Sequence, residues 1–499
     1  MTEYYFTEDH QLFRESLRAF LQKEVMPNID QWEEDRRIPR SIWKKMGEQG
    51  YLGLGYPAAY GGSDLDFFFD VIFCEETSKV FSGGFAITQA VVQYMSSTYL
   101  AKYASEGLKQ KYLPGIIKGE LISSIGISEP TAGSDVANIR TTAQKDGDYY
   151  IVNGSKTFIT NAVYGDFIVT VVKTDPEAGP AGVSLLVIDR NAEGVSASKL
   201  KKLGWHASDT AELTFDEVKV PAENLIGEEG RGFYYLMGGL QMERLVGAVM
   251  GYAACESAMA YTLQYMSERQ AFNRPINKFQ VLRHRMAQLA AEIESCKQFV
   301  LYCARLHNDN KYAVKECSMA KLLATELSDK VMTQCLQMFG GYGYMEEYKM
   351  ARMFRDSRVG TIGGGSSEIM REIIAKMIID DVSYQTASSN HSKNNQLNNN
   401  DMTLETVLNQ IQEKAAAAAP LGNTLKFDFG DQQLYIDGLG DKNQVSMENK
   451  DAACLVQTSF EDFMALISGD LNPMGAVMGG KVKIKGDMSV AMKLQSLFS

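Results

Sequence analysis

The chain has 499 residues, of which 45% are hydrophobic and 22% charged, the composition of a globular protein with roughly three domains. Its 50 Lys and Arg residues against 62 Asp and Glu give a net charge of −12, which excludes a general attraction to nucleic acid or to an anionic membrane. The longest apolar runs, such as residues 167–172, are far shorter than the ~18 residues of a membrane-spanning helix. The five histidines form no zinc-binding cluster and no G-x-S-x-G motif occurs, so neither a protein-built metal site nor a serine hydrolase is expected.

The N-terminus and the cysteines both indicate the compartment. Residues 1–17 are acidic and amphipathic, whereas a signal peptide is basic and then apolar, and a transit peptide is rich in Arg. The seven cysteines are scattered and include no C-x-x-C pair, which predicts reduced and mostly buried thiols. We therefore expect a cytoplasmic protein.

Hydrophobic periodicity predicts a multidomain chain. Apolar residues recur at helical spacing over residues 1–122, as at Leu17 and Leu21, which predicts an α-helical N-terminal domain. Residues 123–230 contain short β-rich runs separated by Gly, Asn, Asp and Pro, which predict a mostly antiparallel β domain. Helical spacing returns over residues 231–381 and predicts an α-helical bundle as the third domain.

A polar tract separates these domains from a tail. Residues 382–401 are largely Ser, Asn and Gln and predict a disordered linker, because they cannot bury enough apolar surface to fold. Residues 402–499 begin with an Ala-containing helix and continue with apolar residues that alternate on both sides of Gly430, which predicts a β-hairpin. Ser459 and Asp462 are spaced as in a helix-capping box. The tail is therefore expected to be a small α+β domain.

Two glycine-rich segments imitate phosphate-binding loops. Residues 53–58 resemble a dinucleotide-binding fingerprint but contain Pro57 and belong to no βαβ unit. Residues 475–482 differ from a P-loop at Val482, where a metal-binding hydroxyl is required, and lead into a strand-like alternation. We interpret both segments as structural.

Several further motifs follow one another between residues 127 and 374. The first, ISEPTAGSDVANIRTTA, begins at Ile127 and offers hydroxyls and backbone amides just before the β domain. It is followed by NGSKTFITN, LGWHASDTAELTFDEVKVPAENLIGEEGRGF, SERQAFNRPINKFQ, QMFGGYGY and GGGSSEIMREII. In content and order these motifs resemble the acyl-CoA dehydrogenase family, over about the first 380 residues. The combination is highly specific.

The resemblance implies that FAD binds among the three domains of a homodimer or homotetramer. Ile127, Ser128 and Thr160 are expected to contact the isoalloxazine, with Thr160 near the reactive N5. Phe158 occupies a position at which many relatives have Trp beside the flavin. The other implied cofactor contacts are those to the pyrophosphate and adenosine (Arg269, Phe272 and Gln280), those from a neighbouring subunit (Gln337, Gly340 and Gly341) and those that close the flavin pocket (Ser366 and Glu368).

The family reaction removes an α-proton from a thioester while the β-hydride moves to flavin N5, and so it requires a base. Many members supply this base from a Tyr-Glu-Gly-Thr segment, which here aligns with residues 363–366 and has Gly364 in place of the acid. The long-chain and isovaleryl-type subgroups supply it from a Glu-Arg-Leu segment of an earlier helix, which Glu243 and Arg244 match. The resemblance therefore implies that Glu243 is the base. It also implies that the N–H of Gly364, with a ribityl hydroxyl, binds the thioester oxygen.

The spacing around Glu243 permits this role. On a helix, the next positions on the same face are Gly247 and Gly251, so we expect a groove for the acyl chain there. A carboxyl in apolar surroundings has a raised pKa, which suits abstraction of a carbon-bound proton. The alternative is a solvated pair of Glu243 and Arg244. Ser134 and Arg244 also match substrate-contacting positions of relatives, and their alternatives are a turn hydroxyl and a core ion-pair partner.

The tail resembles the sterol-carrier-protein-2-like domains, above all through residues 474–498. This resemblance implies an apolar tunnel for acyl chains, acyl-CoA or sterols, and the alternative is a stability or dimerisation module with a filled core. The expected C-terminal helix contains the apolar residues Met488, Val490, Met492 and Leu494.

The predicted function is FAD-dependent α,β-dehydrogenation of a long-chain or bulky acyl-CoA to the trans-2-enoyl-CoA, because Gly363 and Gly364 remove side-chain bulk found in relatives. The tail is expected to bind or deliver lipid or acyl-CoA. An electron-transferring flavoprotein is the expected electron acceptor. Two alternatives stay open: an acyl-CoA oxidase, and a lipid carrier with a vestigial dehydrogenase scaffold.

Overall fold

The computed structural model divides the chain into two compact units, residues 1–388 and 389–499. It describes residues 4–380 of the first unit and mainly residues 420–460, without 431, and 482–486 of the second. A few isolated positions are also described: 382, 408, 411, 412, 415, 462 and 463.

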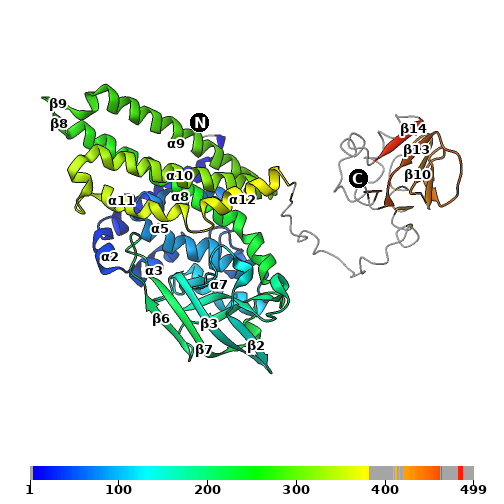
Figure 1. Cartoon of the computed structure of the whole chain (residues 1–499), viewed down its shortest axis with the longest axis horizontal. Helices are drawn as coiled ribbons and strands as arrows, with labels where there is room; N and C mark the ends of the chain where they lie inside the picture. Colours follow the sequence, from blue (N-terminus) through cyan, green and yellow to red (C-terminus); the bar gives the residue numbers. More distant parts are fainter. Residues whose placement is uncertain are drawn as a thin grey trace. The chain divides into compact units, whose positions relative to one another are not determined.

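The first unit begins with helices, as the periodicity predicts (Figure 1). Thr7 starts the first of them, because its hydroxyl accepts a hydrogen bond from the His10 N–H and so satisfies a free donor of the first turn. Another helix, Phe67–Ser78, is apolar on nearly all sides and is buried, as expected for a helix at the centre of a domain. The helices are α1 (Glu8–Phe20), α2 (Ile29–Asp35), α3 (Arg40–Glu48), α4 (Phe67–Ser78), α5 (Gly83–Ala90), α6 (Ser97–Tyr103) and α7 (Glu106–Ile117).

A seven-stranded sheet follows, with the order β1-β4-β2-β3-β7-β6 and β5 paired to β4. All pairs are antiparallel except β1 with β4 and β2 with β4, which confirms the predicted, mostly antiparallel β domain. The central strands are buried on both faces. The strands are β1 (Ser123–Gly126), β2 (Thr142–Asp146), β3 (Tyr149–Thr160), β4 (Phe167–Lys173), β5 (Val183–Asp189), β6 (Val195–Lys199) and β7 (Thr210–Pro221).

Long helices complete the unit. The 37-residue α8 packs extensively against α10, and also against α4 and α9, so it connects the two helical parts of the unit. A short hairpin, β8 with β9, joins α8 to α9 at the end of the bundle that lies away from the sheet (Figure 1). The elements are α8 (Gly232–Glu268), β8 (Gln270–Ala271), β9 (Arg274–Pro275), α9 (Gln280–Asn308), α10 (Val314–Phe339), α11 (Lys349–Ser357) and α12 (Ser367–Ile378).

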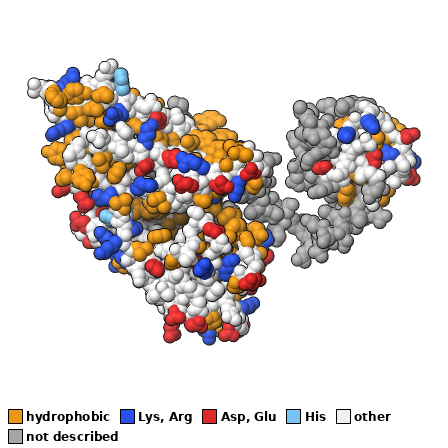
Figure 2. Space-filling view, in the orientation of Figure 1, with side chains coloured by type: hydrophobic (Ala, Val, Ile, Leu, Met, Phe, Trp, Pro, Cys, Tyr) orange, Lys and Arg blue, Asp and Glu red, His pale blue; other side chains and the backbone are white. Residues whose placement is uncertain are grey.

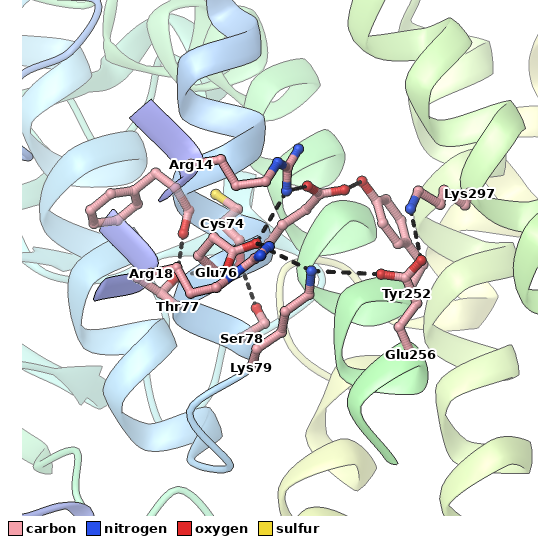
Figure 3. A network of polar contacts seen from close by, with 12 residues as sticks. Arg14, Arg18, Cys74, Glu76, Thr77, Ser78, Lys79, Tyr252, Glu256 and Lys297 are labelled. Carbon is pink, nitrogen blue, oxygen red and sulfur yellow. Dashed lines mark hydrogen bonds and ion pairs between the residues drawn. The ribbon is translucent and has the colours of Figure 1, made fainter. Parts of the chain in front are cut away.

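A network of charges joins α1, α4, α8 and α9 (Figure 3). Arg14 contacts Glu75 and Glu76 of α4, and Arg18 binds Glu76 at 2.8 Å. The Tyr252 hydroxyl of α8 donates to Glu75 at 2.6 Å. Because the carboxylates are buried, their partners determine how these helices can pack.

The second unit contains a five-stranded sheet of order β12-β11-β10-β13-β14. The predicted hairpin is confirmed, since Leu425 pairs with Ile436 and Phe427 with Leu434. Ser459 accepts a hydrogen bond from the Asp462 N–H at 3.0 Å, as the capping prediction requires. The predicted linker, most of the Ala-containing helix and the predicted C-terminal helix lie outside the described residues. The strands are β10 (Thr424–Asp428), β11 (Gln433–Asp437), β12 (Gln444–Ser446), β13 (Cys454–Gln457) and β14 (Lys483–Gly486).

All seven cysteines are buried free thiols, in agreement with the sequence. Among the described residues, none of the helices combines the length and the apolar character needed to span a bilayer. The cytoplasmic location stays a prediction.

Candidate active site

Glu243 lies in α8 and is hydrogen-bonded to Tyr99 of α6. The Tyr99 hydroxyl donates to Glu243 Oε1 at 2.6 Å. This approach depends on Gly239, because a Cβ there would collide with the Tyr99 hydroxyl. The side chain of Glu243 keeps partial access to solvent. The glycine in α8 therefore lets a tyrosine of the N-terminal domain reach the carboxyl.

The surroundings of Glu243 raise its pKa. Burial disfavours the charged carboxylate and is the largest effect. The hydrogen bond from Tyr99 and the positive charge of Arg244 act in the opposite direction, and the net pKa stays above the ordinary value. A carboxyl of this kind is a stronger base than an exposed glutamate.

Arg244 points into the bundle. It is buried and donates to the Ser318 hydroxyl of α10 at 3.3 Å. The alternative of a solvated Glu243–Arg244 pair is therefore wrong, since Glu243 is bonded to α6 and Arg244 to α10. Ser134, in contrast, is exposed on the loop between β1 and β2.

The expected glycine groove is only partly present. A Cβ at Gly247 would meet no atom within 4 Å, so this position borders open space. A Cβ at Gly251 would lie 3.2 Å from the Ala324 carbonyl oxygen and 3.3 Å from its side chain. The prediction is wrong at Gly251, because that glycine is used for close packing of α8 on α10.

Gly364 lies in a turn between α11 and α12 and presents a free amide. Its φ of +63° favours glycine, and a side chain there would meet no atom within 4 Å. The N–H groups of Ile362 and Gly363 both donate to the Val359 carbonyl, at 2.9 and 2.8 Å. The Gly364 N–H has no such acceptor among the residues that the structure describes, and so it is available to a carbonyl oxygen.

A second group of predicted residues lies at the edge of the sheet. Thr157 donates its N–H to the Ser128 carbonyl at 2.9 Å, which joins the Ile127–Ser128 segment to β3. The next residue, Phe158, has a φ of +62° in an irregular part of the β3–β7 pair and is 72% exposed. Thr160 ends the same strand and is half-buried. An exposed aromatic ring beside two hydroxyl residues offers a surface on which another flat ring can stack.

A third group lies around the β8–β9 hairpin. The Arg269 guanidinium lies over the Tyr342 ring, 5.3 Å from its centroid, and both line a cavity of 320 Å³. Gly340 has a φ of +57°, and a Cβ at Gly340 or Gly341 would meet open space. Phe272 is 89% exposed, and Gln280 and Gln337 are exposed as well. Within one chain, Arg269 therefore lies near the Gly340–Tyr344 turn. The β8–β9 hairpin lies at the end of the bundle away from the sheet (Figure 1), so these residues are far from Phe158 and Thr160 of the same chain.

A second cavity, of 570 Å³, adjoins the Gly364 turn. Ser366 and Glu368, both predicted to close the flavin pocket, are among its lining residues, as is Arg358. Ser366 also caps α12, since its hydroxyl accepts from the Ile369 N–H at 3.4 Å. Figure 2 shows this molecule hollowed between the helices and the sheet, with hydrophobic side chains at the hollow.

Comparison with known proteins matches the first unit almost from end to end. Residues 7–120, 124–218 and 230–379 match the N-terminal, middle and C-terminal domains that are described for acyl-CoA dehydrogenases. The mitochondrial long-chain specific acyl-CoA dehydrogenase of Mus musculus is 39% identical over 381 residues, which are 75% of this chain and 88% of the relative. The chain belongs to the acyl-CoA dehydrogenase family. It is therefore a flavin-dependent oxidoreductase with FAD as cofactor.

Another relative and a solved structure are similar to the same part of the chain. The mitochondrial isovaleryl-CoA dehydrogenase of Pongo abelii is 35% identical over 376 residues, 74% of this chain and 88% of the relative. The crystal structure of an acyl-CoA dehydrogenase from Geobacillus kaustophilus is 47% identical, with a TM-score of 0.74, and covers 75% of this chain and 99% of that one. Residues 404–499 match the SCP-2 sterol transfer family.

The candidate cofactor-binding residues have the chemistry that FAD requires. The exposed ring of Phe158, with the hydroxyls of Ser128 and Thr160, suits a flat heterocycle. The Arg269 guanidinium beside the open backbone of Gly340 suits a pyrophosphate, which needs a positive charge and close access to backbone.

Two residues of the site are not predicted from the sequence. Tyr99 gives no local signal, because it is one of 24 tyrosines and meets Glu243 only through tertiary packing. Lys321 contacts the Gly364 turn from α10. The sequence gives only a weak indication of Lys321, namely a lysine on the apolar side of a helix between Cys317 and Ala324.

Proposed function

We propose that this acyl-CoA dehydrogenase converts a long-chain or bulky acyl-CoA into the trans-2-enoyl-CoA, with Glu243 as the base. The observation that carries the proposal is the half-buried Glu243 carboxyl, which is held by Tyr99 and has a raised pKa. An acid at position 364 is absent, and the turn at Gly364 offers a backbone N–H instead of a second carboxyl.

The chain's own groups have separate tasks in this reaction. Glu243 removes the α-proton and holds it on its carboxyl, while the Tyr99 hydroxyl orients that carboxyl. The Gly364 N–H donates to the thioester oxygen, where negative charge develops, and so lowers the barrier. When bound, FAD would supply the acceptor for the hydride that leaves the β-carbon. Ile127, Ser128, Phe158 and Thr160 are the proposed contacts of its ring.

The substrate class follows from the space around the base. Gly364 and Gly247 both border open space, so the site has room for a long or branched chain. The named relatives act on long-chain acyl-CoA and isovaleryl-CoA. Ser134 is proposed to contact the CoA part, whereas the bond of Arg244 to Ser318 favours its structural alternative.

We propose that two copies of the chain complete each cofactor site, in a homodimer or homotetramer. The support is the separation, within one chain, of the β8–β9 hairpin from the sheet edge (Figure 1). Because Arg269 lies beside the Gly340–Tyr344 turn within one chain, the proposed pyrophosphate and adenosine contacts (Arg269, Phe272 and Gln280) come from the neighbouring copy together with Gln337, Gly340 and Gly341. Ser366 and Glu368 are proposed to close the flavin pocket. The proposed electron acceptor is an electron-transferring flavoprotein.

The tail is proposed to bind lipid or acyl-CoA and to deliver it. The match of residues 404–499 to the SCP-2 sterol transfer family supports lipid binding. A delipidated tail that fails to bind a fluorescent fatty acid would contradict this part of the proposal.

The function is tested by anaerobic bleaching of the bound flavin with a panel of acyl-CoAs. Long or branched acyl-CoAs should bleach it and yield the enoyl-CoA. Release of hydrogen peroxide in air would instead indicate an oxidase.

Glu243→Gln should retain the flavin spectrum but lose activity by roughly 10²-fold or more, because the amide cannot accept the α-proton. Gly364→Glu added to this variant should restore only part of the activity, because a Cβ at position 364 would meet open space but its φ of +63° strains any side chain. Full activity of Glu243→Gln would contradict the assignment.

A further inference from the structure

One face of α10 carries buried polar residues that no step of the reaction uses. Ser318, Lys321 and Thr325 follow one another at helical spacing, and each is almost fully buried. Ser318 accepts the hydrogen bond from Arg244, the residue that follows the proposed base. The Thr325 side chain lies 3.4 Å from the position of a Cβ at Gly360. This face of α10 therefore contacts both α8 and the turn that carries Gly364.

Lys321 makes the central contact of this face. Its Nζ donates to the Gly360 carbonyl at 2.9 Å and to the Gly365 carbonyl. The side chain is only 3% exposed, and within the described part of the chain no carboxylate forms an ion pair with it. Burial and the nearby charge of Arg244 lower the pKa of Lys321 to about 8. A buried ammonium is costly, so carbonyls that solvate it are held firmly in place.

The Gly360 and Gly365 carbonyls that Lys321 contacts lie on either side of Gly364 along the sequence. Gly360 precedes and Gly365 follows the residues whose backbone turns at Gly364. Glycines at 364 and 365, both with positive φ, give this turn little stiffness of its own. The direction of the Gly364 N–H therefore depends on contacts from outside the turn, and the Lys321 ammonium supplies two of them.

We propose that Lys321 is a positioning residue, which fixes the Gly360–Gly365 turn by its two carbonyl contacts and so aims the Gly364 N–H at the thioester oxygen. This inference rests on the proposed function. It predicts that loss of Lys321 impairs recognition of the substrate carbonyl more than recognition of the rest of the ligand. A residue that only stabilises the fold would not separate the two.

The test compares Lys321→Met with Lys330→Met in the full-length holoenzyme. Both substitutions remove an ammonium from α10, but Lys330 is half exposed and pairs with Glu292 at 2.7 Å. Two ligands are titrated into each variant by calorimetry: an enoyl-CoA thioester, and a CoA thioether of the same chain that lacks the carbonyl oxygen. Turnover and flavin content are measured on the same samples.

Lys321→Met should lower kcat and thioester affinity by about tenfold to a hundredfold, the range for a misplaced donor, and change thioether affinity by less than about twofold. Lys330→Met should leave kcat and the affinities for both ligands unchanged. Equal losses for both ligands, or no loss for either, would overturn the inference. If Lys321→Met does not fold, Lys321→Gln is measured in the same way. Wild-type enzyme that no acyl-CoA bleaches would instead refute the proposed function, so the two failures are distinguishable.

Discussion

At the residue scale, the proposed chemistry depends on the Glu243 carboxyl and on the hydroxyl that donates to it. Among the described residues, Glu243 has one hydrogen bond, from Tyr99, and burial disfavours its charge more than Tyr99 and Arg244 favour it. The Tyr99 hydrogen bond favours the ionised carboxylate at working pH, while burial keeps the pKa of Glu243 above its ordinary value. Removing the donor should therefore change the pH at which the base becomes active.

Tyr99→Phe should shift the acid limb of the pH profile of kcat/KM to higher pH. The Tyr99 hydroxyl bonds the carboxylate and lowers the pKa of Glu243 against the larger effect of burial, so its loss raises that pKa further. Activity should fall severalfold below the limb and recover above it. The control is Tyr103→Phe, since Tyr103 stacks on Tyr235 at 4.1 Å and does not bond Glu243. Superimposable profiles for Tyr99→Phe and wild type would contradict this role.

The sequence predicts the acidic residue but not its partner. Glu243 is found because a short motif places it, and Gly364 because it replaces an acid in another motif. Tyr99 belongs to a different domain, and its contact depends on Gly239 of α8, which no local pattern reveals. Gly251 shows the same limit, because helical spacing cannot distinguish a glycine that borders space from one that packs against Ala324.

At the element scale, helices and strands are predicted well where the pattern is local. The β10–β11 hairpin has the predicted pairing because alternation and a turn residue determine its register. The charge network of α1, α4, α8 and α9 is not predicted, because its members are separated by up to 283 residues in the chain, from Arg14 to Lys297. Contacts of this kind follow only from tertiary packing.

Glu76→Gln should destabilise the first unit in a pH-dependent way. Burial raises the pKa of Glu76, but Arg18, Lys79 and Arg14 outweigh it and lower that pKa to about 2. The folded pKa lies below the unfolded one, so this stabilisation is complete above about pH 4.5 and is lost as the pH falls toward 2. At pH 7 the variant should lose on the order of 3 kcal/mol.

The measurement for Glu76→Gln is urea denaturation followed by tryptophan fluorescence, because Trp32, Trp43 and Trp205 all lie in the first unit. The difference from wild type should narrow as the pH is lowered below 4.5. Glu346→Gln is the matched control, since Glu346 is 82% exposed and pairs with Arg355 at 3.3 Å; it should change stability by less than about 0.5 kcal/mol. A constant difference at all pH values would refute the electrostatic explanation.

At the scale of the whole molecule, a dehydrogenase unit and an SCP-2 sterol transfer family domain share one chain. Each unit has its own hydrophobic core among the residues that the structure describes. Their fusion therefore calls for a functional reason. The predicted linker of about 20 residues would give each unit an effective concentration near the other of around millimolar, which would favour transfer of a bound acyl-CoA over its loss to solution.

Cleavage between the units should therefore raise the apparent KM for long acyl-CoA. A protease site placed within residues 382–401 allows the same sample to be assayed before and after cutting, with both units still present. At low concentrations of a long acyl-CoA the rate should fall severalfold, because delivery then requires a bimolecular encounter. A short acyl-CoA, which needs no carrier, should react equally well before and after. If the long and short substrates respond alike, or neither responds, the tail does not deliver substrate and its role must lie elsewhere, such as in stability or dimerisation.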